Sequence, residues 1–226
     1  MTVDLEPLKR EAAEAAIEAE VRSGMVLGLG TGSTASHVVI TLGQLLRDGA
    51  LHDIVGVPTS EATARLAREH GVPLATLAEQ PRLAVCLDGA DEIGPGLGLV
   101  KGLGGALLRE KIVASAADRF VVVADASKRV ARLGEHAPVP VEVIRFGEAV
   151  CARALSALGG EVVPRDGFIT DEGNRILDCR FGPLDDPGRL AEAIRSIPGV
   201  VEHGLFLGMA ELAYIGGDGG VDVLRS

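Results

Sequence analysis

The sequence predicts an α/β protein in which a parallel sheet, covered by helices on both faces, is joined to a smaller α+β unit. Up to Arg132, short apolar runs alternate with amphipathic helical stretches, the pattern of a parallel sheet with crossover helices. Several of these runs end in glycine, hydroxyl or charged residues, as buried strands that stop at a ligand-binding edge do. After Arg132 the order becomes strand, helix, strand, strand, helix, strand, which is a split βαβ pattern.

The elements of the first part follow from apolar periodicity and from capping residues. Its predicted strands are short apolar runs at Met25–Leu29, Asp53–Val57, Pro73–Leu77, Leu83–Leu87 and Arg119–Ala124. Its predicted helices are Asp4–Arg22, a segment that ends near Arg47, Ser60–His70 and Gly105–Ala117. Asp4 and Ser60 are the expected N-caps, and Gly24 and Gly71 are the expected stops.

The second part is predicted to be a compact insertion before the last strands. We expect strands at Val139–Ile144 and Glu161–Pro164, a hairpin of Phe168–Thr170 with Arg175–Cys179, and helices at Gly147–Leu158 and Pro187–Ile197. Three further apolar runs, at Leu205–Leu207, Leu212–Ile215 and Val221–Leu224, are expected to return to the first sheet. The predicted domains are therefore 1–132 with 206–226, and 133–205.

Composition excludes several classes of protein. The 226-residue chain has a formal net charge of −10 at pH 7, which argues against a nucleic-acid or anionic-membrane partner. Its three scattered cysteines form no CxxC pair, which predicts free thiols in a reducing cytoplasm. We do not expect the charged N-terminal segment to be a signal peptide, and no apolar run has membrane-spanning length. The histidines show no metal-ligand spacing, so we expect neither a metal nor another cofactor.

A glycine and hydroxyl loop follows the first predicted strand. The segment Gly28–Thr34, with hydroxyls on Thr31, Ser33 and Thr34, leads directly into a helix. Helix N-termini present free N–H groups and positive dipole ends, so a phosphate or carboxylate suits this position. The loop lacks the lysine of a P-loop and the third glycine of a dinucleotide fingerprint. A tight turn that packs the helix is the alternative interpretation.

The stretch from Asp88 to Lys111 contains most of the candidate catalytic residues. Asp88 and Asp91 follow a buried strand, and Lys101 then stands on a glycine-rich turn that precedes a helix. Carboxylates, a cation and exposed backbone amides are thus expected at the ligand-binding edge. Asp-Gly is also a common turn pair, so a purely structural role for the two aspartates is the alternative.

Glu110 is predicted to point toward the apolar side of its helix, with Ala106, Val113 and Ala117 on the same face. Burial raises the pKa of a carboxyl group, which suits a general base near neutral pH. The alternative is a buried ion pair between Glu110 and Lys101 or Arg109.

A second cation, Lys128, follows the strand that ends at Ala124. Because it lies on the expected ligand edge, contact with a phosphate is one interpretation, and an ordinary solvated lysine is the other.

Six motifs stand along the chain: GLGTGSTA (28–35), DGADE (88–92), KGLGGALLREK (101–111), ADASK (124–128), PVEV (140–143) and LAYIGG (212–217). Together they resemble, over nearly the whole chain, the ribose-5-phosphate isomerase family, type A. DGADE with the downstream KGxGGALxREK is the most specific part. Members often have glycine where this chain has Leu103, which makes the turn less permissive here.

The resemblance implies a Rossmann-like domain with an inserted ferredoxin-like α+β domain. It implies that ribose 5-phosphate and ribulose 5-phosphate are interconverted through an enediol(ate), a step of the non-oxidative pentose phosphate pathway. It also implies no metal, a sugar phosphate as the small-molecule partner, and a homo-oligomer, commonly a homodimer.

The resemblance also assigns roles residue by residue. The implied phosphate site consists of Thr31, Gly32, Ser33 and Thr34 with Lys128. The implied sugar site consists of Asp88, Gly89, Ala90 and Asp91 with the loop of Lys101, Gly102, Leu103 and Gly104. The implied base is Glu110. Lys101 would stabilise negative charge on the sugar oxygens. Whether Asp88 or Asp91 opens the ring, and which of them moves the hydroxyl proton, stays open.

Two other functions compete with an isomerase. A non-catalytic sugar-phosphate sensor of the same fold would keep the anion loop, but it would not need Glu110, Lys101 and both aspartates. It would normally carry a helix-turn-helix, whereas the N-terminal segment here reads as a single acidic helix. A relative of acyl-CoA transferases would need a glutamate nucleophile in a larger chain.

Overall fold

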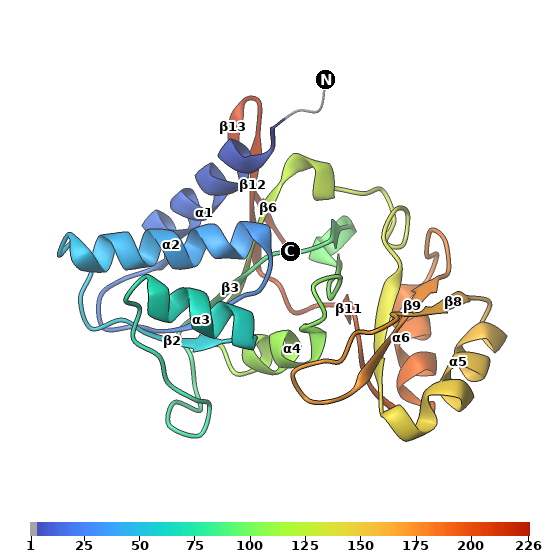
Figure 1. Ribbon diagram of the computed structural model, residues 1–226. Coiled ribbons are helices and arrows are strands. Elements are labelled where there is room, and N and C mark those ends of the chain that lie inside the picture. The colour runs from blue at the N-terminus through green and yellow to red at the C-terminus, as the bar shows by residue number, and fades with distance from the viewer. Residues whose placement is uncertain (1–3) are drawn as a thin grey trace. The chain divides into compact units, whose positions relative to one another are not determined.

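The computed structural model describes residues 4–226, which form two compact units (Figure 1). The first unit comprises 4–89, Arg109–Lys128 and Met209–Ser226, and the second comprises Ala90–Leu108 and Arg129–Gly208. Both are built from helices and strands, and the α/β fold class is confirmed.

Six strands form the sheet of the first unit, in the order β13-β12-β6-β3-β1-β2. They are β1 (Val26–Leu29), β2 (Val55–Pro58), β3 (Val85–Asp88), β6 (Phe120–Asp125), β12 (Leu212–Gly217) and β13 (Gly220–Arg225). All neighbouring pairs are parallel except β12 and β13, which form an antiparallel hairpin. The chain reverses its direction across the sheet between β1 and β3, and ligands of open parallel sheets bind at such a switch point.

Helices cover both faces of this sheet. They are α1 (Glu6–Glu20), α2 (Ser33–Arg47), α3 (Glu61–Glu69) and α4 (Leu107–Ser115), the last of which begins in the second unit. Leu27 and Leu29 of β1 join the core formed with α1 and α2. Gly28 points the other way, because a Cβ on it would lie 2.7 Å from the Val113 side chain of α4. Successive residues of β1 therefore point to opposite faces of the sheet, one covered by α1 and α2 and the other by α4.

The second unit contains two antiparallel sheets. A four-stranded sheet has the order β10-β7-β9-β8, and a three-stranded sheet has the order β11-β5-β4. The larger sheet and its helices comprise, in chain order, β7 (Val139–Val143), α5 (Glu148–Ala157), β8 (Glu161–Pro164), β9 (Arg175–Arg180), α6 (Pro187–Arg195) and β10 (Val200–His203). The smaller sheet comprises β4 (Glu92–Ile93), β5 (Leu99–Val100) and β11 (Leu205–Phe206). The order βαββαβ is the predicted split βαβ pattern.

Four local predictions need correction. Pro73–Leu77 is not a strand, and its one ladder contact is an isolated bridge between Gly56 and Leu74. Phe168–Thr170 belongs to the loop between β8 and β9, so the turn at 171–174 does not connect two strands. Leu205–Phe206 pairs with β5, and the two later strands alone return to the first sheet. Asp4 lies just before α1, where its carboxylate accepts a hydrogen bond from the N–H of Glu6, and the N-cap is Leu5.

The cysteine thiols are free and buried. Burial, and then the charge of Asp178, raises the pKa of Cys179 from 9.0 to about 12, so this thiol stays protonated in the fold at pH 8. No helix among residues 4–226 is long and apolar enough to cross a membrane.

We expect Cys179 to react with iodoacetamide at pH 8 far more slowly in the native protein than in urea, because the thiolate is the nucleophile. Its raised pKa also favours the unfolded state as the pH rises from about 9 toward about 12. Mass spectrometry of the alkylated peptide at increasing times measures the first effect. Equal rates with and without urea would contradict it.

Candidate active site

The loop after β1 forms the N-terminus of α2. Gly32 has φ 118° at the N-cap of α2, a conformation that L side chains rarely adopt. Gly32 and Ser33 are exposed, and Thr34 is buried. The first amides of a helix have no intrahelical acceptor, so the loop presents backbone N–H groups and the Ser33 hydroxyl at the positive end of a 15-residue helix.

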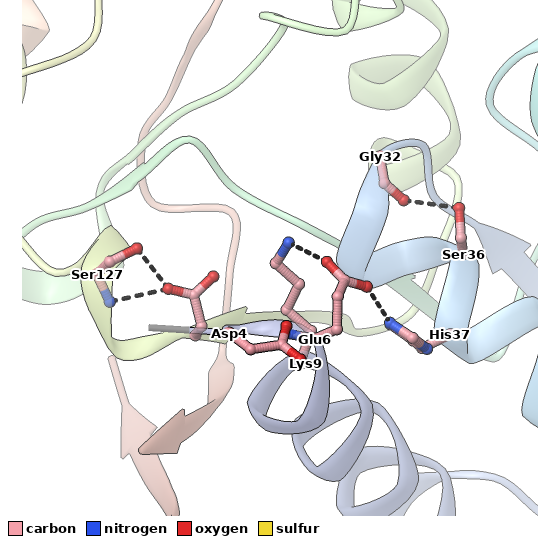
Figure 2. Close-up of polar contacts among 8 residues, drawn as sticks. Asp4, Glu6, Lys9, Gly32, Ser36, His37 and Ser127 are labelled. Carbon is pink, nitrogen blue, oxygen red and sulfur yellow. Dashed lines mark hydrogen bonds and ion pairs between the residues drawn. The ribbon is translucent and has the colours of Figure 1, made fainter. Parts of the chain in front are cut away.

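Side chains of α1 lie beside the first turn of α2 (Figure 2). The carboxylate of Glu6 accepts hydrogen bonds from Lys9 at 2.7 Å and contacts Nε2 of His37 at 3.0 Å. These contacts, first Lys9 and then His37, hold the pKa of Glu6 below its usual value. In the same turn, Ser36 donates to the Gly32 carbonyl at 2.9 Å. The start of α2 is thus fixed to α1 by a cluster that carries a cation.

Asp88 connects the end of β3 to the end of β1. Its Oδ1 atom accepts the N–H of Thr31 at 3.0 Å and the N–H of Gly89 at 2.7 Å. Gly30 packs so closely against the Asp88 carboxylate that a Cβ there would overlap it. The structure therefore brings together the predicted anion loop and the first predicted aspartate.

A second buried carboxylate, Asp125, ends β6. Its Oδ1 accepts both the N–H and the hydroxyl of Ser127, and Figure 2 shows Ser127 in these two contacts. This local cap fixes the short turn Ala126–Lys128, so the half-buried Lys128 follows a rigid strand end. Because β6 lies next to β3 in the sheet, the turn stands at the same edge as Asp88 and Gly89.

The second unit carries the predicted residues between Ala90 and Gly104. Ala90 and Asp91 are half-buried, and Oδ2 of Asp91 accepts the N–H of Leu103 at 2.9 Å. The glycine loop is thereby tied to the second aspartate, and the Leu103 amide is already engaged. Leu103 is not among the residues with positive φ, so this turn tolerates leucine.

Lys101 is 2% exposed. Its backbone N–H donates to Gly204 at 2.8 Å, and its ammonium lies 5.5 Å from the centroid of the Phe206 ring. Gly102 next to it has φ 105°, and a Cβ there would lie 2.7 Å from Leu107. The loop of Lys101, Gly102 and Gly104 thus carries a buried cation on backbone that requires glycine at Gly102.

Glu110 is buried, with 4% exposure, as its place on the apolar side of the helix predicted. The residue before it, Arg109, pairs with Glu61 of α3 at 3.0 Å. One of the two cations considered as partners of Glu110 therefore makes an ion pair with a different carboxylate.

Sequence reasoning missed three groups of residues that support these loops. Thr59, Ser60 and Thr63 surround the Thr31 hydroxyl. Arg165 donates to the Leu103 carbonyl at 3.0 Å while its guanidinium also binds Asp178. Glu92, the last residue of DGADE, accepts three backbone N–H groups from residues 134–137. The hydroxyl run at 59–63 was the one local signal, and the other contacts join distant segments.

Comparisons with known proteins agree with this architecture. The family model of ribose 5-phosphate isomerase A (phosphoriboisomerase A) matches residues 55–220. A ribose-5-phosphate isomerase A of Roseiflexus castenholzii is 61% identical over 218 residues, 94% of this chain and 93% of that protein. One from a Synechococcus strain is 54% identical over 96% of each chain.

Solved structures show the same similarity in three dimensions. A D-ribose-5-phosphate isomerase in complex with phospho-erythronic acid superposes with a TM-score of 0.96 at 39% identity, over 99% of this chain and 100% of that one. The ribose 5-phosphate isomerase A of Methanocaldococcus jannaschii gives 0.93 at 43% identity, with the same coverage. From the family model, the relatives of more than 50% identity and these structural matches, it follows that the chain belongs to the ribose 5-phosphate isomerase A family.

Proposed function

We propose that this protein is an aldose–ketose isomerase that interconverts ribose 5-phosphate and ribulose 5-phosphate. Membership of the family supports the reaction, and the observation that carries the mechanism is the buried carboxylate of Glu110 on α4. The alternative of a non-catalytic sensor finds no support among these relatives, which are named as isomerases.

The reaction moves a carbonyl group between C1 and C2 of the sugar. A base removes the proton from C2 of the open aldose, an enediol(ate) forms, and the proton is returned to C1. Glu110 performs both transfers in our proposal, because one carboxylate that accepts a proton can give it back on the neighbouring carbon. Burial disfavours the charged form of a carboxyl group and so strengthens it as a base.

The phosphate is proposed to bind at the start of α2. The loop from Thr31 to Thr34 supports this placement, because the amides at the start of the helix and the helix dipole favour an anion there. Lys128 supplies a positive charge from the strand end of β6. A protein with a net charge of −10 needs such a local positive site to hold an anionic substrate.

Asp88, Asp91 and Lys101 are proposed to act on the sugar oxygens. Lys101 and loop amides stabilise the negative charge that develops on the enediolate, a contribution of about 3–4 kcal/mol for a well-placed donor. Asp88 with Gly89 and Ala90, and Asp91 with the Lys101–Gly104 loop, bind the hydroxyl groups. The two aspartates share ring opening and hydroxyl proton transfer.

A direct assay tests the function. The purified chain is given ribose 5-phosphate, and the appearance of ketose is followed, with arabinose 5-phosphate as a competitor that keeps the phosphate and changes the C2 configuration. We expect turnover that the competitor inhibits. A chain that binds ribose 5-phosphate without forming ketose would support the sensor.

Replacing Lys128 with Ala should raise KM for ribose 5-phosphate by about tenfold, because a charge-assisted bond to phosphate is lost. Binding of free ribose should change much less. Steady-state kinetics and competition by free ribose measure the two effects. Arg82→Ala is the matched control, since it removes one positive charge at an exposed pair with Asp118. Equal losses for ribose 5-phosphate and ribose would contradict phosphate contact.

Turnover should survive exhaustive treatment with a chelator, because the proposed proton transfers use carboxylates and Lys101. The measurement is kcat before and after dialysis against EDTA, followed by addition of divalent cations. Loss of activity that a particular metal restores would show that the expectation of a metal-free enzyme is wrong.

We also propose that the protein is a cytoplasmic homodimer and that it binds neither nucleic acid nor membranes. Free thiols and the acidic charge support it, as does the place that the family's reaction has in pentose phosphate metabolism. The proposed division of the chain into a Rossmann-like domain, 1–132 with 206–226, and an inserted domain, 133–205, follows the same family pattern.

A further inference from the structure

We propose that Thr59, Ser60 and Thr63 are positioning residues that fix Thr31, and that Thr31 joins the anion loop to Asp88 instead of donating a hydrogen bond to the substrate. The proposal deepens the function proposed above and rests on it, because it concerns how the same site is held in shape.

Four hydroxyl groups meet beneath the anion loop. The Thr31 oxygen Oγ1 lies 2.7 Å from Oγ1 of Thr59, 2.8 Å from Oγ of Ser60 and 3.0 Å from Oγ1 of Thr63. The three partners come from the end of β2 and the first turn of α3, and all are buried. This is a closed polar cluster within the first unit, with no charged member.

The protons of this cluster form one directed chain. Thr63 donates to the Gly30 carbonyl at 2.8 Å, and Ser60 donates to Thr63 at 3.0 Å. Thr31 donates to Ser60. The Thr59 hydroxyl donates to the Leu29 carbonyl at 3.0 Å, so in its contact with Thr31 it accepts. Each hydroxyl has one proton, and the single proton of Thr31 is used inside the cluster.

The backbone donor of Thr31 is used as well. Its N–H donates to Oδ1 of Asp88 at 3.0 Å. Thr31 therefore has neither a hydroxyl proton nor an amide left for an anion, whereas Gly32, Ser33 and Thr34 stand at the open start of α2. The phosphate contacts belong to these three residues, and Thr31 sets where they stand relative to Asp88.

This arrangement makes distant hydroxyls matter for catalysis. Breaking the chain at Thr63 or Ser60 frees Thr31 and lets the loop and Asp88 move relative to each other. Small misplacement of groups that act on substrate lowers kcat, whereas loss of a plain phosphate contact raises KM and leaves kcat unchanged.

Kinetics of Thr31→Val, Thr63→Val and the double variant test the proposal. Each single variant should lower kcat/KM about five- to tenfold, as expected for one lost hydrogen bond in a buried network, with most of the loss in kcat. The double variant should lose no more than the worse single variant, since both break one network. Thr63→Ser, which keeps the hydroxyl, should restore most of the loss.

Ser115→Ala is the matched control, because that hydroxyl donates to Lys111 at 2.8 Å within α4 and should leave the kinetics unchanged. If Thr63→Val does not fold, Ser60→Ala breaks the same chain and should lower kcat equally. The proposal is overturned if Thr31→Val raises KM and the inhibition constant of inorganic phosphate at unchanged kcat while Thr63→Val behaves as wild type. Additive losses would also overturn it. Absence of turnover in the wild-type protein would instead reject the proposed function.

Discussion

Replacing Glu110 with Gln is expected to lower kcat by about 100- to 10,000-fold while the protein stays folded. A positioned base contributes a rate factor of this size, and an amide cannot remove the C2 proton. KM should change little, because the carboxylate acts on the proton in transit and contributes little to substrate binding. The side chain is buried and the substitution conserves its shape, so the packing of α4 against β1 is preserved.

Two measurements separate chemistry from structure in this variant. Steady-state turnover gives kcat, and exchange of the C2 hydrogen of ribose 5-phosphate with deuterated water reports proton removal independently of product release. Glu61→Gln is the matched control, because it breaks an exposed ion pair to the neighbouring Arg109 without touching Glu110. Near-normal turnover, or exchange that persists without turnover, would remove Glu110 from the role of base.

Much of the fold was predictable because it follows from local patterns. Short apolar runs gave β1, β3 and β6, and a parallel sheet then places their polar ends together. The burial of Glu110 followed from helical spacing alone. These features can be predicted without knowing which distant segments of the chain contact one another.

Other features depend on contacts between segments distant in the sequence. The apolar residues of Leu205–Phe206 suit a strand of the first sheet, yet the segment pairs with β5. Two apolar residues predict a strand but do not specify which strand they pair with. Phe168–Thr170 has strand-like residues, but Phe168 packs on Gly105 and Thr170 donates to Glu142, so side-chain contacts outweigh local propensity.

The candidate site divides in the same way. Its charged and glycine residues stand in recognisable motifs, whereas the groups that hold them in place do not. Thr31 meets its three hydroxyl partners across about thirty residues of chain, and Arg165 reaches the Leu103 carbonyl across a longer span. Spacing within a motif carries no information about either contact.

Glu92 is expected to give the largest effect on stability. It is 1% exposed, and its carboxylate accepts the N–H groups of Gly134 and His136 at 2.6 Å each and of Ala137 at 2.8 Å. Glu92→Ala would leave three buried donors without their acceptor and should lower the free energy of unfolding by about 3–5 kcal/mol. Urea unfolding followed by circular dichroism measures the loss.

Glu92→Gln distinguishes a structural acceptor from a hidden acid or base. The amide oxygen still accepts the two N–H groups that Oε1 receives, while the amide nitrogen faces the N–H of Gly134. We therefore expect roughly half the loss of the Ala variant, with kcat of the folded protein close to wild type. Glu161→Ala, at an exposed position in β8, is the control and should change stability little.

The two buried glutamates of the motif region thus make opposite predictions. Glu110→Gln should abolish most turnover and spare stability, whereas Glu92→Ala should spare turnover of the folded protein and lower stability. Burial alone does not separate them, since both are nearly inaccessible. The three converging backbone donors identify Glu92 as structural, because its carboxylate oxygens are already engaged in holding residues 134–137. A large fall in kcat for Glu92→Gln at unchanged stability would reverse this assignment.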